Sequence, residues 1–130
     1  MSRRALADTS LFIARETGRP LGPYAEDAEI AISMVTIAEL EMGVLAASEP
    51  QTRATRLRTL RDAEQLSALP VDRDVASAFA ALAIRMRESG LGRIGVQDAW
   101  IAATAIAHDA DLLTQDGDFD AVPGLRLIRL

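Results

Sequence analysis

Acidic side chains stand where helices and strands of the predicted fold begin or end. Asp98 lies in the first turn of a predicted helix, on the same face as Ile101 and Ala105. An anion there faces the core beside the positive end of the helix dipole. Asp116 and Asp118 follow a predicted strand, at the edge where open α/β sheets bind ligands. A fold that brings these side chains together would form a small acidic cup.

Two further acidic residues occupy comparable places earlier in the chain. Asp8 ends a predicted first strand, and Glu39 lies one turn into the helix after a predicted second strand. Carboxylates that meet at one edge repel one another unless protons or a cation neutralise them. A divalent cation held by carboxylates polarises a phosphoryl oxygen and activates water for in-line attack. The set Asp8, Glu39, Asp98 and Asp116 is therefore typical of a metal-dependent nuclease.

Each of these residues also has a purely structural interpretation. An aspartate near a helix start is commonly a cap, and the segment that holds Asp116 can be an ordinary turn. Thr36 and Glu39, three residues apart, match a capping box. A positive φ at Gly117 would leave Asp118 to cap the turn, which is our prediction. A chain that stays extended would instead point both aspartates into the cup.

The composition limits the chemistry. The chain has 130 residues, 49% of them hydrophobic, which predicts a single domain over residues 1–130. It has no cysteine, so a metal must bind oxygen ligands or the lone His108. His108 is expected to be structural. Mg²⁺ and Mn²⁺ are the ions that prefer the remaining oxygen ligands. All 14 basic residues are arginine. The absence of lysine disfavours receiver domains and haloacid-dehalogenase-type phosphatases, which share this fold class and use one.

Short strands alternate with helices along the whole chain. Strands are predicted over residues 5–8, 29–33, 66–69, 112–114 and 125–130. Successive strands among the first four are separated by one or two helices, and the fourth strand is joined to the fifth by a turn without a helix. This order predicts an α/β fold in three layers, a mostly parallel sheet of about five strands with helices on both faces. The first helix is expected to be capped by Thr9 or Ser10, and the second to open at Thr36.

One predicted helix, Gln51–Gln65, carries four arginines and has no clean apolar stripe. It is expected to be weakly buried, with Leu57 and Leu60 on a surface that faces solvent or a partner. No apolar run approaches the roughly 18 residues of a membrane span, and the N-terminus lacks a signal-peptide core. The sequence therefore predicts a cytoplasmic protein.

Four motifs resemble the PIN-domain family and, more narrowly, the VapC toxins of bacterial VapBC toxin–antitoxin modules. They are L-A-D-T-S, T-I-A-E-L-E-M-G, Q-D-A-W-I-A-A-T-A and L-L-T-Q-D-G-D-F, in this order across nearly the whole chain. The resemblance implies a PIN-like fold and a Mg²⁺-dependent endoribonuclease toxin, with Mn²⁺ as a substitute. It also implies a homodimer held inactive by a VapB-like antitoxin. The alternative is a PIN fold that grips RNA or protein without cutting, and the intact acidic positions argue against it.

The resemblance also implies roles for individual residues. The catalytic acidic quartet corresponds to Asp8, Glu39, Asp98 and Asp116. The implied metal ligands are Asp8, Asp98 and Asp116, with Asp118 as an extra candidate, and which of the last two binds stays open. Residues expected to support the site are Thr114 at the family's hydroxyl position, and Thr9 and Ser10 after the first aspartate. Independently of the resemblance, Arg93 precedes the helix that carries Asp98 and is predicted to be a basic residue near the cup.

Overall fold

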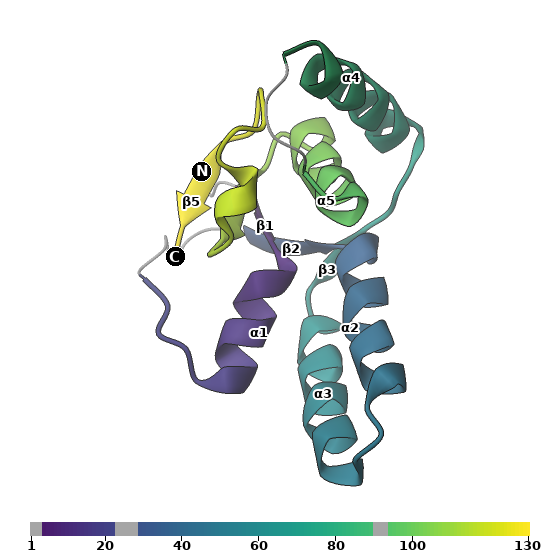
Figure 1. Cartoon of the computed structure of the whole chain (residues 1–130), viewed down its shortest axis with the longest axis vertical. Helices are drawn as coiled ribbons and strands as arrows, with labels where there is room; N and C mark the ends of the chain where they lie inside the picture. The colour runs from purple at the N-terminus through teal and green to yellow at the C-terminus, as the bar shows by residue number, and fades with distance from the viewer. Residues whose placement is uncertain (1–3, 23–28, 90–93) are drawn as a thin grey trace.

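Five parallel strands form one sheet, and helices cover both of its faces (Figure 1). The structure is a computed structural model that describes residues 4–22, 29–89 and 94–130. The strands are β1 (Arg4–Ala7), β2 (Glu29–Ser33), β3 (Ser67–Leu69), β4 (Asp111–Thr114) and β5 (Leu127–Arg129). The helices are α1 (Thr9–Thr17), α2 (Met34–Ala46), α3 (Pro50–Ala63), α4 (Arg73–Ser89) and α5 (Val96–Ala107). The predicted α/β fold is confirmed.

The register of the sheet sets up one functional edge. The strand order is β3-β2-β1-β4-β5, so β1 lies at the centre. Ala7 pairs with Ile32 on one side and with Leu113 on the other. The residues that follow these three, Asp8, Ser33 and Thr114, therefore emerge side by side at the carboxyl ends of the strands.

Alternate strand residues pack into two core clusters. Leu6 and Leu112 face α4 and α5 and pack with Ile101. Ala7 and Ile32 face the opposite way and pack against α1, α2 and α3. Because both faces of the sheet are covered, the central strands are apolar on both sides, as is usual for parallel sheets. These clusters fix the helix starts that carry the acidic side chains.

Helices α2 and α3 lie side by side as a hairpin that extends away from the sheet (Figure 1). Two arginines of α3 bond to backbone carbonyls near the end of α2: Arg56 to Gly43 at 2.8 Å and Arg53 to Ala47 at 2.7 Å. Cations are favourable at a helix carboxyl end, where unpaired carbonyls carry partial negative charge. These contacts give two of the four arginines of α3 a structural role.

The prediction for α3 is wrong at Leu60. That side chain is only 5% exposed and packs into the cluster under α1 and α2, whereas Leu57 remains 37% exposed. The helical wheel of α3 shows no clear apolar face because the side chains of its arginines flank the few residues that are buried. The start of α2 also differs from the prediction, since the helix begins at Met34 with Ser33 as its cap. The last strand, β5, is shorter than predicted.

No helix among the described residues is both long enough and apolar enough to cross a membrane.

Candidate active site

Asp8 lies at the centre of the carboxyl edge and is 3% exposed. It caps α1, which corrects the predicted cap at Thr9 or Ser10: its Oδ2 accepts a hydrogen bond from the Ser10 backbone at 3.4 Å. The hydroxyl of Thr114, at the end of the neighbouring strand, donates to the same oxygen at 2.9 Å. Burial raises the pKa of Asp8, and these hydrogen bonds partly offset that rise.

Thr114 connects three parts of the site. Besides donating to Asp8, its Oγ1 accepts a bond from the Asp116 backbone at 2.9 Å and lies 3.2 Å from the Ser10 hydroxyl. Ser10 in turn accepts a bond from the Gln115 backbone at 3.0 Å. Strand β4, helix α1 and the turn after β4 are thus tied together at Asp8.

Glu39 reaches the same edge from α2. Its Oε1 accepts a hydrogen bond from the Thr9 hydroxyl at 2.8 Å, and Thr9 Oγ1 lies 3.2 Å from Thr36 Oγ1. The predicted capping box is therefore wrong. Ser33 caps α2 by accepting a hydrogen bond from the Val35 backbone, and the side chains of Thr36 and Glu39 bond to Thr9 instead. Burial raises the pKa of Glu39, the bond from Thr9 lowers it, and the charge of Asp8 raises it further.

Asp98 lies in the first turn of α5, where the negative charges of the other acidic residues at this edge act on it. Burial makes the largest contribution and raises its pKa, and the charges of Asp8, Asp116, Glu39 and Asp118 add to that rise in this order. The result is a pKa of about 6, against an ordinary value of 3.8. The expected meeting of these side chains is thus found in the structure.

Three of the carboxylates lie close enough to share one cation. Each of Asp98, Asp116 and Asp118 offers an oxygen within 4.8 Å of the other two. Asp8 and Glu39 stand beside this group, close enough to raise the pKa of Asp98. The donors are all carboxylate oxygens, the ligands that hard divalent cations prefer. Such an ion would also relieve the repulsion within the group.

The turn after β4 differs from both predicted conformations. Residues Gly117–Phe119 form a single 3₁₀ turn, and Gly117 has no positive φ. Asp116, rather than Asp118, is the cap: its Oδ1 accepts a hydrogen bond from the Asp118 backbone at 2.9 Å. The ring of Phe119 is fully buried and anchors the turn, which brings both aspartates to Asp98.

Arg93 falls outside the described residues. His108 ends α5 as its C-cap, in keeping with the structural role predicted for it. Sequence reasoning missed Thr36 as part of the site. The signal that would have revealed it is Ser33, a better-placed cap directly at the end of β2.

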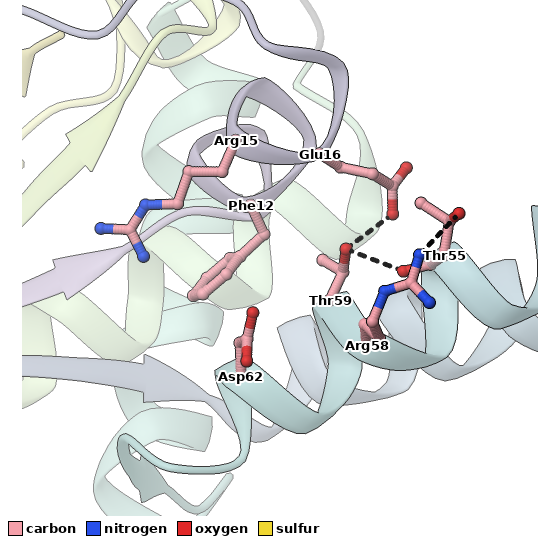
Figure 2. Close-up of a pocket in the computed structure, with 7 residues that line it drawn as sticks. All are labelled: Phe12, Arg15, Glu16, Thr55, Arg58, Thr59 and Asp62. Carbon is pink, nitrogen blue, oxygen red and sulfur yellow. Dashed lines mark hydrogen bonds between the residues drawn. The ribbon is translucent and has the colours of Figure 1, made fainter.

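Two hollows flank α1 beside this site. One, of about 380 Å³, adjoins the acidic edge and is lined by Thr9, Ile13, Glu16, Thr17, Glu39, Leu40, Gly43 and Arg56. The other, of about 270 Å³, lies between α1 and α3, where Phe12 points toward α3 (Figure 2). Glu16 lines both hollows and accepts a hydrogen bond from Thr59 at 2.8 Å. The surface that leads from the carboxylates toward the α2–α3 hairpin is therefore hollowed.

Metal-free thermal stability is expected to fall as the pH rises from 5 to 7. The folded state holds a proton on Asp98 up to about pH 6, whereas the unfolded chain releases it near 3.8, so stability is lost across this interval. After allowance for solvent screening we expect a loss of about 1 kcal/mol, or roughly 3 °C in Tm. Melting curves with and without Mg²⁺ test this. Saturating Mg²⁺ should remove the difference. Asp98→Asn should reduce it without removing it, because Asp8 and Glu39, whose pKa values are also raised, remain. Equal melting temperatures at pH 5 and pH 7 in the metal-free wild type would contradict the prediction.

Comparison with known proteins identifies relatives of nearly full length. The PIN domain family model matches residues 5–125. Ribonuclease VapC4 of Mycobacterium tuberculosis is 43% identical over 128 residues, which cover 98% of each chain. Ribonuclease VapC5 of the same organism is 43% identical over 123 residues, 95% of this chain and 90% of the relative. The crystal structure of VapBC-5, from the VapBC family of toxin–antitoxin systems of M. tuberculosis, superposes with a TM-score of 0.81 at 37% identity over 98% of both chains. The family match spans every acidic residue of the site.

Proposed function

Because this chain belongs to the PIN-domain family and is a relative of the VapC ribonucleases, we propose that it is a metal-dependent endoribonuclease toxin of a toxin–antitoxin pair. The observation that carries the proposal is the group of three carboxylates, Asp98, Asp116 and Asp118, within 4.8 Å of one another. Asp8 and Glu39 complete the site beside them. Such a site fits hydrolysis of a phosphodiester bond.

The residues that would hold a divalent cation are Asp98, Asp116 and Asp118, with Asp8 beside them. We assign Mg²⁺ as the natural ion and Mn²⁺ as its substitute, since both prefer carboxylate oxygens. A bound ion supplies a polarised phosphoryl oxygen and a water of lowered pKa. Burial, followed by the charges of Asp8 and Asp116, raises the pKa of Asp98, and a bound cation would offset this unfavourable environment for the carboxylate, which supports the assignment.

Glu39 is the residue that we assign to proton transfer. It stands outside the group of three, and its Oε1 accepts a hydrogen bond from the Thr9 hydroxyl. Burial raises its pKa, which makes its carboxylate a better proton acceptor near neutral pH. Glu39 would accept a proton from the attacking water, while Thr114 and Ser10 hold Asp8 in place.

The partners follow from the relatives and from the surface. We propose RNA as the substrate, a VapB-like antitoxin as the inhibitor and a homodimer as the assembly, acting in the cytoplasm where RNA is present. Exposed apolar side chains on the α2–α3 hairpin support a protein partner: Met42 is 57% exposed, Leu45 75% and Leu57 37%. We treat residues 1–130 as one domain, since both core clusters share one sheet.

Product chemistry tests the mechanism. With Mg²⁺, the purified protein should cleave single-stranded RNA and leave 5′-phosphate and 3′-hydroxyl ends, because water attacks the phosphorus. Ligation-based sequencing of the fragments reports the 5′ ends directly, and EDTA should abolish them. Fragments with 2′,3′-cyclic phosphate ends would contradict the mechanism. RNA that is bound with Mg²⁺ but left intact would instead favour a binding module.

A further inference from the structure

Thr36 is a fully buried threonine whose hydroxyl has a functional neighbour. It is 0% exposed, and its Oγ1 lies 3.2 Å from Thr9 Oγ1. Thr9, the first residue of α1, donates to Glu39 at 2.8 Å. The start of α2 does not need Thr36, because Ser33 already caps that helix. The Thr36 hydroxyl oxygen therefore contacts the site through Thr9.

Thr9 is the donor in both of these contacts. A threonine hydroxyl carries one proton, and an ionised carboxylate only accepts. The shorter of the two contacts runs from Thr9 to Glu39, at 2.8 Å. Thr9 is also the donor in its 3.2 Å contact with Thr36, so the Thr9 hydroxyl is directed between two acceptors, the Glu39 carboxylate and the Thr36 hydroxyl oxygen. A separate set of hydroxyl contacts joins Ser10, Thr114 and Asp8, with distances of 3.2 and 2.9 Å.

Holding Glu39 matters because a glutamate side chain has several rotatable bonds. Fixing such a side chain costs conformational entropy. A hydroxyl that is itself held in one orientation reduces the range of positions open to the carboxylate. Thr36 supplies that hold from inside the core, where its hydroxyl oxygen accepts from Thr9 and water cannot compete for it.

We propose that Thr36 is a positioning residue for RNA cleavage: its buried hydroxyl orients Thr9, and Thr9 holds the Glu39 carboxylate in its working position. The inference rests on the proposed function and on the role proposed for Glu39. It assigns no contact with substrate to Thr36 itself.

Two substitutions at Thr36 separate the hydroxyl from the packing. Thr36→Val keeps the volume and loses the hydroxyl, and Thr36→Ser keeps the hydroxyl and loses a methyl group. Loss of one hydrogen bond should lower kcat about tenfold in Thr36→Val, with KM changed by less than about twofold. Thr36→Ser should keep kcat within about twofold yet melt at a lower temperature, because it leaves a small cavity. Activity and stability would thus rank the two variants in opposite orders.

A matched control comes from another buried threonine. Thr104 is also 0% exposed, but its hydroxyl bonds the Trp100 carbonyl of its own helix at 2.8 Å. Thr104→Val should leave kcat unchanged within about twofold, since that hydroxyl does not touch the site. Thr9→Val should reproduce the loss seen in Thr36→Val, and the double variant should lose no more than Thr9→Val alone, because Thr36 acts through Thr9.

Several outcomes would overturn the inference. One is an unchanged kcat in Thr36→Val, and another is an equal loss in the Val and Ser variants, which would indicate packing alone. Additive losses in the double variant with Thr9→Val would show that Thr36 does not act through Thr9. If the wild type and Thr104→Val both failed to cleave RNA, the proposed function would fall and this inference with it. If Thr36→Val did not fold, the test would rest on Thr36→Ser, whose kcat must stay near that of the wild type, and on the loss expected in Thr9→Val.

Discussion

Asp98→Asn should abolish RNA cleavage and at the same time make the metal-free protein more stable. Removing residues that only support a metal ligand commonly costs 10–100-fold in activity, so loss of a ligand itself should cost on the order of 10³-fold. Asp98 is the carboxylate on which the others converge, and it belongs to the group of three that would share a cation. The same loss is expected for Asp8→Asn, at the buried centre of the edge.

The gain in stability has a separate cause. Asparagine has the shape of aspartate without its charge, so each variant removes repulsion and the burial of an anion. Asn also remains a good helix cap, which preserves the start of α1 at position 8. We expect Tm without metal to rise by roughly 3 °C in each variant at pH 7, an increase that added Mg²⁺ should not enlarge. Differential scanning calorimetry and a cleavage assay on the same preparations measure both effects.

Asp74→Asn is the matched control for these variants. Asp74 also lies in the first turn of a helix, α4, but it takes no part in the acidic group. It should change cleavage by less than about twofold, as surface substitutions away from special features usually do. Retained cleavage in both Asp8→Asn and Asp98→Asn would overturn the assignment of the site. Cleavage lost together with stability would indicate misfolding instead.

The meeting of the acidic residues was predictable because it depends on the order of elements. Parallel strands joined by helices bring their carboxyl ends to one edge, whatever the details of packing. Ala7 pairs with Ile32 and Leu113, so Asp8 had to emerge beside the ends of β2 and β4. Asp98 followed from the apolar face of α5, which places the first turn of that helix over the same edge.

The choice of hydrogen-bond partner was not predictable from local patterns. Ser33 and Thr36 both suit a helix cap, and the sequence does not reveal which one the end of β2 places at the helix start. The register of β2 places Ser33 at the helix start, so Ser33 is the cap. Thr36 bonds instead to Thr9, a residue 27 positions away. The prediction that Leu60 is exposed failed for a similar reason. Its burial depends on how the α2–α3 hairpin packs against α1, which local sequence does not reveal.

The turn after β4 gives the last prediction, which separates two neighbouring aspartates. Asp116 has two tasks: its Oδ1 accepts the Asp118 backbone bond at 2.9 Å, and its carboxylate belongs to the group within 4.8 Å of Asp98. Asparagine can still accept the hydrogen bond from the Asp118 backbone, but it cannot supply the negative charge that binds a cation. We therefore expect Asp116→Asn to weaken Mn²⁺ binding by more than about 100-fold without lowering Tm, since loss of a ligand exceeds the 10–100-fold typical of residues that only support one. Asp118 is exposed, so a water molecule can replace its oxygen on the ion, and Asp118→Asn should weaken binding only by about threefold.

Calorimetric titration of Mn²⁺ into the metal-free variants measures this difference. Asp116→Ala should lose the cap as well as the charge, and its unfolding free energy should fall by about 1 kcal/mol relative to Asp116→Asn. Asp120→Asn is the control for net charge, since Asp120 lies on the same turn and pairs with Arg129 outside the group of three. If Asp118→Asn weakened Mn²⁺ binding more than Asp116→Asn, Asp118 would be the main ligand. Asp116 would then serve only to fold the turn that presents it.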